Sequence, residues 1–522
     1  MERIWKVVLA AFAAFGLLAF TLGFAVAFGV GFSQVKLLND LTFDSMADEP
    51  HLTEQLFEQI QPETLETSLK WISSSSHMTG QYRDTEIREW IRKLFLKYRF
   101  HPVSVREYDV LLSMPDERNA NKVELYSREQ ELTFSTSGSR GYEGQAGGQG
   151  ARTFPPYHAY SPAGEVEGCL TYVNYARVED FKRLKELKVP VQNCIAIARN
   201  GEIYRGNKVL NAQEYNAKAL ITYSDPEEVA RNGESTSAVF PNSWWLPANG
   251  VESGTVLNGE GDPLTPGWAS MTGAHRLKVE DLKVIPEIPS QPVSYGDART
   301  LLASLGGEDP PYGWSGRLQD VQYKLGGEFT PESNIQKAKV VVTNRLVEGK
   351  VSNVLGIIRG AVEPDRYVIV GNHRDAWGTG AVDPASGTAA LMSVAQAFGH
   401  LGNELGWRPR RTIVFASWGA EELGAIGSTE WVEENMPKVK ERTVAYVNTD
   451  MCVSGRDLRA TASPALKEVI EAAIKVIPDP GDATGERSYY EFWKGAGSDS
   501  EFGPAVIKLP FKGKLFKNLF YF

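Results

Sequence analysis

Three short apolar runs in the second half of the chain each end in polar residues. They occupy residues 367–370, 412–416 and 444–447 and are rich in β-branched and small apolar side chains. Runs of this length and composition are typical of buried strands. Acidic residues or a histidine follow each run within a few positions. We therefore expect an open α/β sheet whose strands bring charged groups to one edge, where such sheets bind ligands.

Apolar residues at helical spacing predict helices around these strands. Between residues 84 and 98 one face collects six large side chains, and Asp84 or Thr85 is the expected N-cap. That face consists of Ile87, Trp90, Ile91, Leu94, Phe95 and Tyr98. The same spacing predicts helices over residues 386–401 and 466–477, and a strand is expected at residues 108–112.

A long stretch, residues 114–346, separates the first helix and strand from the three apolar runs. It opens with a loop at residues 135–150 that is too rich in Gly, Ser and Gln to bury much surface. An apolar strand at 194–198, a helix at 206–216 and a second apolar strand at 219–223 follow. This β-α-β order predicts a folded α/β unit within the insertion.

The N-terminus is uncharged from Val7 to Phe32. A helix of roughly 20 apolar residues spans a bilayer, so this run is long enough for a membrane anchor. A cleaved signal peptide is the alternative, but its apolar region is about half as long. With Arg3 and Lys6 on the cytoplasmic side, we expect a single-pass type II protein whose bulk lies outside the cell.

Composition agrees with a large folded ectodomain. Acidic residues outnumber basic ones by 65 to 55 and no long basic run occurs, so we expect no nucleic-acid partner. A chain of 522 residues predicts two or three domains. Its three cysteines, Cys169, Cys194 and Cys452, are too few for a disulfide framework.

Five residues past the strand ends are the candidate active site. They are His373, Asp383, Glu421, Glu422 and Asp450. Nitrogen and oxygen ligands without cysteine suit zinc, and a shared carboxylate suits a two-metal hydrolase. Of two adjacent glutamates, one can hold metal while the other accepts a proton. Any one of these residues alone is more often a helix cap or a solvated loop residue.

Four motifs around these residues closely resemble the glutamate carboxypeptidase II family. They span residues 372–377, 381–387, 407–411 and 415–422, and the similarity runs from the N-terminal anchor to about Leu509. That family comprises membrane-anchored, di-zinc M28-type peptidases and N-acetylated alpha-linked acidic dipeptidase-like relatives. The resemblance implies an α/β mixed-sheet zinc-exopeptidase domain with an inserted protease-associated apical α+β domain and an N-terminal transmembrane helix.

The resemblance also implies the division of the chain. It gives a cytoplasmic tail at 1–6, a transmembrane helix at 7–32, a stalk at 33–55, peptidase segments at 56–113 and 347–509, an apical domain at 114–346 and an unrelated tail at 510–522. The implied localisation is the plasma membrane, with the catalytic domain extracellular.

Residue roles follow from the resemblance in the same way. It implies that His373 and Asp450 hold one zinc ion, that Asp383 bridges two ions and that Glu422 holds the second. Glu421 is then the general base, and Asp375 orients the His373 imidazole.

Two further sites are implied by the family. A structural calcium is expected between the side chains of Glu430 and Glu433 and the main-chain carbonyls of Thr265 and Trp268. Arg205 and Arg459 are the expected substrate-binding residues, because a guanidinium grips a carboxylate at two points. Without the family, Arg205 before Gly-Asn is a solvated turn residue. The position of a substrate-side asparagine falls on Thr255 here, which puts the acidic-dipeptide pocket in doubt.

The sequence also departs from the family. No histidine follows His400, although a downstream histidine completes the second zinc site in the family. In the family a C-terminal helical domain carries homodimerisation; we expect no counterpart of it in this chain and therefore do not expect the family's homodimer here. We expect a di-zinc exopeptidase acting on small peptides, such as acidic dipeptides, that is impaired in this chain. A catalytically inactive, receptor-like ectodomain is the alternative, and the direction of cleavage stays open.

Overall fold

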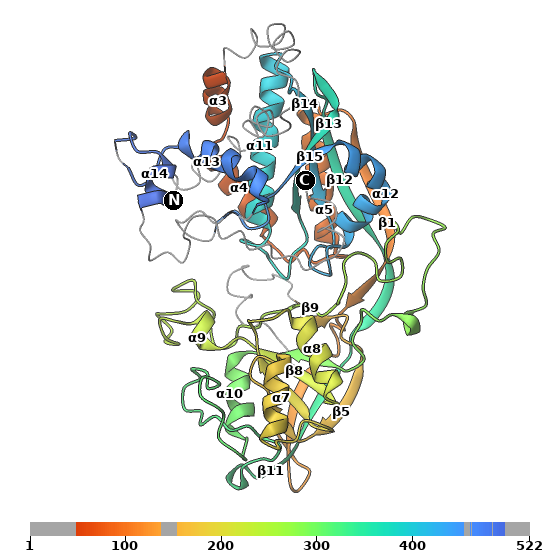
Figure 1. Cartoon of the computed structure of the whole chain (residues 1–522), viewed down its shortest axis with the longest axis vertical. Coiled ribbons are helices and arrows are strands. Elements are labelled where there is room, and N and C mark those ends of the chain that lie inside the picture. The colour runs from red at the N-terminus through yellow and green to blue at the C-terminus, as the bar shows by residue number, and fades with distance from the viewer. Residues whose placement is uncertain (1–48, 137–153, 454–459, 461, 483, 496–522) are drawn as a thin grey trace.

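A five-stranded mixed sheet forms the frame of the first domain (Figure 1). The computed structural model describes residues 49–136, 154–453, 460, 462–482 and 484–495. The strand order is β1 (Val103–Met114), β12 (Arg345–Ile358), β14 (Arg411–Trp418), β13 (Glu363–His373) and β15 (Thr443–Asn448). β13 runs parallel to both β14 and β15, whereas β12 runs antiparallel to β1 and β14. The expected mixed α/β sheet is confirmed.

Side chains alternate between the two faces of this sheet, as the pleat of a strand requires. Val368 and Val370 of β13 belong to one buried cluster with Phe415 of β14, whereas Ile369 and Val414 belong to another. Because both faces are apolar, helices must cover both.

Helices from two separate parts of the chain cover the first face of the sheet. They are α3 (Glu49–Glu58), α4 (Pro62–Ile72), α5 (Tyr82–Lys97) and α11 (Ala385–Glu404). On the other side of the sheet in Figure 1 lies α12 (Ile426–Arg442), whose Trp431 packs against the second cluster. α13 (Lys467–Lys475) and α14 (Tyr489–Gly495) form a small separate cluster with Phe57.

The start of α5 differs from the prediction. The helix begins at Tyr82 rather than at Asp84 or Thr85, and its N-cap, Gln81, makes no side-chain capping bond. Asp84 lies inside the first turn, where its Oδ1 is 2.8 Å from Nε of the buried Arg374. Asp84 therefore forms a buried ion pair instead of capping the helix.

The strands β1 and β12 connect the two domains. They pair antiparallel from Val103 with Gly356 to Met114 with Arg345. In Figure 1 this ribbon extends from the sheet of the first domain toward the inserted domain at the bottom.

The inserted domain contains two four-stranded sheets. The parallel sheet has the order β10 (Ser290–Pro292), β8 (Ala219–Tyr223), β7 (Ile195–Arg199) and β6 (Leu170–Tyr172). The antiparallel sheet has the order β3 (Leu132–Ser135), β2 (Lys122–Ser127), β11 (Ile335–Val342) and β5 (Gly164–Gly168). β4 (His158–Ala159) pairs with β9 (Gly254–Thr255). The main helices are α7 (Val178–Glu186), α8 (Arg205–Glu214) and α10 (Tyr295–Ala303), and α9 (Pro226–Val229) is a single turn.

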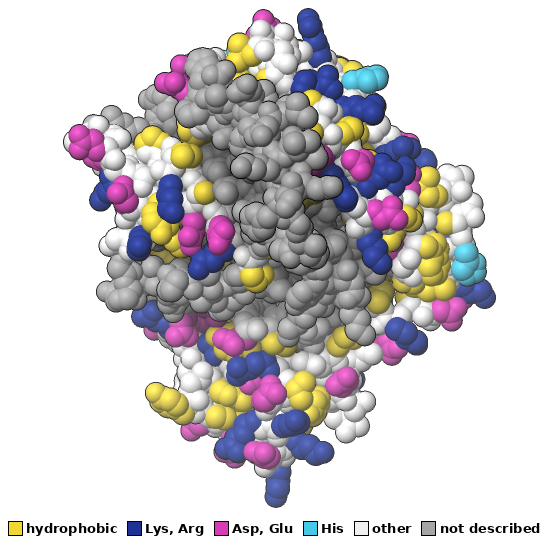
Figure 2. Space-filling model, turned by 45° about the horizontal axis from the view of Figure 1, so that its top comes forward, with side chains coloured by type: hydrophobic (Ala, Val, Ile, Leu, Met, Phe, Trp, Pro, Cys, Tyr) yellow, Lys and Arg dark blue, Asp and Glu magenta, His cyan; other side chains and the backbone are white. Residues whose placement is uncertain are grey.

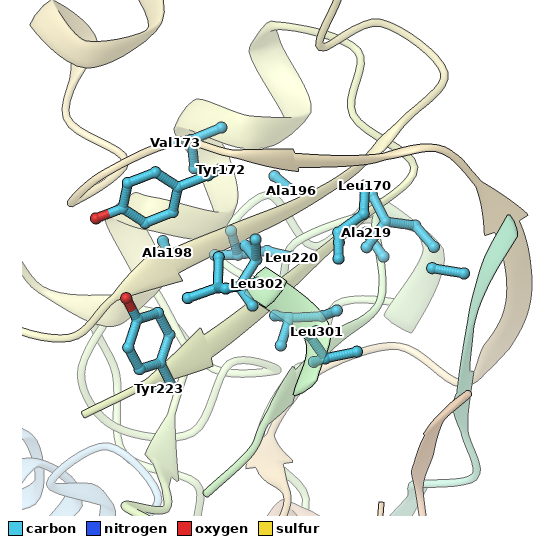
Figure 3. Close-up of a cluster of buried hydrophobic side chains, with 14 of the residues drawn as sticks. Leu170, Tyr172, Val173, Ala196, Ala198, Ala219, Leu220, Tyr223, Leu301 and Leu302 are labelled. Carbon is cyan, nitrogen blue, oxygen red and sulfur yellow. The ribbon is translucent and has the colours of Figure 1, made fainter. Parts of the chain in front are cut away.

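The core of this domain lies between the parallel sheet and its helices. Figure 3 shows Leu220 of β8 close to Leu301 and Leu302 of α10, with Tyr172 and Tyr223 at one side of the cluster. All five side chains are at most 1% exposed. The helix predicted at residues 206–216 is observed at Arg205–Glu214, so it ends two residues before the predicted end.

One disulfide is present, which the cysteine count did not predict. Cys169 and Cys194 are bonded, and Cys452 is a free, partly buried thiol. The two bonded cysteines directly precede β6 and β7, which pair in parallel from Leu170 and Ile195. Parallel neighbours begin at the same edge of a sheet, so the strand register brings the two cysteines together. Three cysteines cannot all be paired, but this count still allows one disulfide and one free thiol.

Several predicted segments lie outside the described residues. They are the anchor at 7–32, most of the loop at 135–150 and the tail at 510–522. Among the residues that are described, no helix combines the length and apolar character needed to cross a bilayer. On the face seen in Figure 2, basic and acidic side chains are intermixed over the described surface.

Candidate active site

The ends of three neighbouring strands position the candidate site. His373 is the last residue of β13 and pairs with Trp418, the last residue of β14. Asn448 ends β15 and lies beside Gly371. Because the three strands are parallel, the segments that follow them emerge at the same edge of the sheet.

The His373 imidazole is the centre of the cluster. Its Nε2 lies 2.9 Å from Asp450 Oδ1, 3.3 Å from Asp383 Oδ1 and 3.9 Å from Glu421 Oε2. The ring is only 3% exposed, whereas the three carboxylate side chains are 32–45% exposed. One side of the cluster is therefore buried in the domain and the other is open to a ligand.

Close packing of α11 against the third strand end supports this arrangement. Gly387, in the first turn of α11, has no room for a side chain: a Cβ atom there would lie 1.6 Å from the carbonyl oxygen of Thr449 and 2.2 Å from that of Asp450. The Thr388 hydroxyl donates a 2.6 Å hydrogen bond to Asn372 Oδ1, next to His373. The helix thus connects the Asp383 loop to the other two strand ends.

The Glu421 loop, residues 419–425 between β14 and α12, adopts an uncommon backbone conformation. Ala420 and Ala425 have φ angles of +57° and +51°, in the left-handed region that alanine rarely occupies. Each such residue costs on the order of 1 kcal/mol, so the surrounding contacts must hold the loop in place.

Asp375 provides much of this support. Its Oδ1 accepts a 3.0 Å hydrogen bond from the backbone N–H of Glu421, and its Oδ2 accepts one of 3.2 Å from that of Glu422. That Asp375 orients the imidazole stays a prediction. Nδ1 of His373 lies 2.9 Å from the main-chain oxygen of Asp375 and 3.7 Å from its carboxylate. The carboxylate mainly holds the Glu421 loop, and the carbonyl faces the ring.

The clustered charges perturb one another. Burial alone lowers the pKa of His373, but the Glu421 carboxylate and the carboxylate oxygens of Asp375, Asp383 and Asp450 around the ring raise it well above its usual value. Burial raises the pKa of Glu421 to about 7 and that of Glu422 well above its usual value. A carboxyl with a pKa near neutrality is suited to accept and return a proton.

Two segments of the chain match known protein families. Residues 353–500 match peptidase family M28, and residues 158–258 match the PA domain. The chain is also 38% identical over 496 residues to aminopeptidase NAALADL1 of Mus musculus, a match that covers 91% of this chain and 65% of that protein.

Residues 353–500 belong to peptidase family M28.

Other relatives carry carboxypeptidase names. The chain with this M28 domain is 41% identical over 443 residues to probable glutamate carboxypeptidase LAMP1 of Arabidopsis thaliana, covering 83% of the chain and 60% of that protein. The chain therefore spans 60–65% of the length of these two relatives. The resemblance to the glutamate carboxypeptidase II group is confirmed, and so is the inserted protease-associated domain.

A solved structure agrees with the fold. A peptidase M28 precursor from Shewanella amazonensis superposes with a TM-score of 0.50 at 15% sequence identity, covering 82% of this chain and 80% of that chain. At this identity the likeness concerns the fold alone.

The donor set of this M28 domain fits zinc. One ligand atom each from His373, Asp383 and Asp450 lies within 4.8 Å of the others. Asp383 Oδ1 is inaccessible to solvent and lies 3.3 Å from His373 Nε2. One imidazole and two carboxylates are ligands that zinc prefers. Glu422 lies beside this group, and its Oε1 accepts a 3.3 Å hydrogen bond from the backbone N–H of Trp377.

The predicted calcium ligands come from two segments that the fold brings together. Glu430 of α12 is fully buried and accepts hydrogen bonds of 2.7 and 2.6 Å from the backbone N–H groups of Asp262 and Ser270. Thr265 and Trp268 lie in the loop between these two donors. Burial raises the pKa of Glu430 to about 7 and that of Glu433 to about 8.

The two predicted substrate arginines have different outcomes. Arg205 forms a 2.8 Å ion pair with Glu252, a partner that the sequence analysis did not find. Arg459 lies outside the described residues. The insertion does contact the active-site loop, because the Thr255 hydroxyl donates a 3.0 Å hydrogen bond to the carbonyl of Leu423. No sequence pattern marks Glu252, which lies in an irregular segment between Gly250 and Gly254.

Proposed function

We propose that this chain is a zinc-dependent exopeptidase that hydrolyses small peptides. The observation that carries the proposal is the group formed by His373, Asp383 and Asp450, with the Glu421 carboxylate 3.9 Å from the same imidazole. The family membership and the aminopeptidase and carboxypeptidase names of the relatives support it.

The protein residues have separate tasks in this mechanism. His373, Asp383 and Asp450 would hold one zinc ion, and Asp383 and Glu422 would contribute to a second. Bound zinc supplies Lewis acidity. Glu421 accepts a proton from the attacking water and passes it to the departing amine, so that one water is consumed and one peptide bond becomes an acid and an amine. Asp375 keeps Glu421 in position through its backbone N–H.

Replacing the general base tests this mechanism. Glu421→Gln keeps the shape of the side chain but cannot accept the proton, so we expect kcat to fall by about 10²- to 10⁴-fold, the contribution typical of general-base catalysis. The zinc content, measured by mass spectrometry of the metal, is expected to stay at the wild-type level. The control is Glu348→Gln, an exposed residue of β12. Loss of zinc in Glu421→Gln would instead make Glu421 a ligand, and a zinc-loaded wild-type protein without hydrolysis would favour a receptor-like ectodomain.

We further propose that Arg205 and Arg459 bind the substrate carboxylate, with acidic dipeptides as candidate substrates. Matched peptides with a blocked N-terminus or an amidated C-terminus would separate the two directions of cleavage. Hydrolysis only of peptides with a free C-terminus, together with a raised KM in Arg205→Ala, supports a carboxypeptidase. Hydrolysis only of peptides with a free N-terminus supports an aminopeptidase and rejects this role of Arg205.

A calcium ion beside α12 is also part of the proposal. Glu433 Oε2 is buried without a hydrogen bond among the described residues, and two nearby carboxyls with raised pKa values would gain from a divalent cation. A rise in the free energy of unfolding on addition of calcium tests it.

Membrane anchoring by residues 7–32 is proposed from the sequence alone. Fractionation of cells that express the full chain tests it. The protein should remain in membranes after alkaline extraction, and its catalytic domain should be open to protease at the cell surface. Release by alkaline extraction would reject the anchor.

A further inference from the structure

The segment between α4 and α5 forms one wall of the active site, although it lies almost 300 residues before the metal-site motifs. The His77 backbone N–H donates a 3.1 Å hydrogen bond to the carbonyl of Gly378, and Ala376 N–H lies 3.4 Å from the carbonyl of His77. Residues 77–79 therefore pair with the loop that follows His373. His77 and Thr79 are 0% and 2% exposed.

The Thr79 side chain makes a single contact with the catalytic machinery. Its hydroxyl donates a 2.9 Å hydrogen bond to Oδ2 of the fully buried Asp375. The same carboxylate receives the backbone N–H groups of Glu421 and Glu422. Three donors thus fix one carboxylate, and two of them belong to the loop that carries the proposed base.

We propose that Thr79 is a positioning residue for the Glu421 loop, acting through Asp375. Without the hydroxyl, Asp375 loses a donor at Oδ2 that does not come from the Glu421 loop, and the carboxylate can rotate. The backbone of the Glu421 loop contains left-handed Ala420, so it depends on this carboxylate to stay in its conformation. Thr79 itself touches neither substrate nor metal in this proposal, which rests on the proposed peptidase function.

The test uses three variants of the full chain. Thr79→Val removes the hydroxyl and keeps the shape, whereas Thr79→Ser keeps the hydroxyl. The control is Thr412→Val at the opposite end of β14. It loses a buried hydroxyl that donates to the carbonyl of Pro364 at 2.8 Å and accepts from the backbone N–H of Gly360 at 3.1 Å. The backbone pairing of His77 with the 376–378 loop does not involve the hydroxyl, so Thr79→Val should fold.

Steady-state kinetics give the first readout. A hydrogen bond to a charged group predicts a fall in kcat of about 10- to 100-fold in Thr79→Val, with KM changed less than about threefold. Thr79→Ser should recover kcat to within about threefold, and Thr412→Val should match the wild type. Equal kcat in Thr79→Val and the wild type, or equal losses in Thr79→Val and Thr412→Val, would overturn the proposal.

Hydrogen exchange gives a second readout that needs no activity. The peptide that covers Glu421 and Glu422 should exchange several-fold faster in Thr79→Val than in Thr79→Ser, while peptides from β13 stay unchanged. If the wild type hydrolyses nothing but this difference is present, the peptidase function fails and the positioning role stands. If hydrolysis occurs and exchange does not change, the positioning role fails. Should Thr79→Val not fold while Thr412→Val does, Thr79 is a structural residue and the proposal is rejected.

Discussion

The buried carboxyl of Glu430 predicts a specific dependence of stability on pH. Its pKa of about 7 lies above the ordinary value of 4.5 because burial disfavours the charged form. Below pH 4.5 the carboxyl is protonated in both the folded and the unfolded chain. Between pH 4.5 and 7 the unfolded chain loses this proton while the folded chain keeps it, so the free energy of unfolding falls as the pH rises.

The size of the effect follows from the pKa difference. Ionising a carboxyl with a pKa of about 7 instead of 4.5 costs about 3 kcal/mol. In the absence of divalent ions, Glu430 should therefore reduce the stability of the wild type by about this amount between pH 4.5 and 8. A calcium ion favours the ionised form, so saturating calcium should reverse the loss.

Urea unfolding at several pH values, with a chelator or with calcium, measures this effect. Glu430→Gln cannot titrate, so the difference in unfolding free energy between the wild type and Glu430→Gln reports this carboxyl together with its effect on Glu433, whose pKa the Glu430 charge raises. The glutamine amide cannot accept both backbone N–H bonds. This loss lowers the unfolding free energy of Glu430→Gln by a constant amount that does not depend on pH. Glu441→Gln, an exposed residue on the same helix, should behave as the wild type. A difference that stays constant within about 1 kcal/mol from pH 5 to 8 with chelator would refute the reasoning, and an unchanged stability in calcium would refute the cation site.

Two further predictions concern packing at the site. Gly387→Ala places a Cβ atom against the carbonyls of residues 449–450 and should abolish zinc retention on dialysis. In the control Gly402→Ala, in the same helix, the Cβ atom meets only an ordinary contact at 3.7 Å, so this variant should retain as much zinc as the wild type. Equal retention in both variants would contradict the close packing. Asp84→Asn leaves the buried Arg374 without its 2.8 Å ion-pair partner and should lower the free energy of unfolding by about 3–5 kcal/mol in denaturant titrations. A loss below about 1 kcal/mol would mean that another group compensates the guanidinium.

Periodicity predicted the frame of the molecule because strand and helix spacing follow directly from burial. The strand at residues 219–223 is found unchanged, and the helix expected at residues 386–401 is found as Ala385–Glu404. The strand ends then brought His373 and Asp450 together, because parallel neighbours end at the same edge. The topology of a sheet thus converts a local pattern into a distant contact.

Contacts between segments that lack a repeating pattern could not be predicted. Asp84 looked like a helix cap, but the tertiary structure uses it to neutralise a buried guanidinium. The disulfide between Cys169 and Cys194 depends on the register of two strands, which composition does not reveal. Thr79 carries no motif at all, and only its position against Asp375 marks it.

The ribbon of β1 and β12 has an architectural consequence. The chain leaves the first domain at Met114 and returns at Arg345, and these two residues are direct partners in the ribbon. The whole inserted module is therefore attached where a tight hairpin turn would otherwise stand. Such a junction allows a complete folded unit to be gained or exchanged during evolution without any change in the strand order of the host sheet.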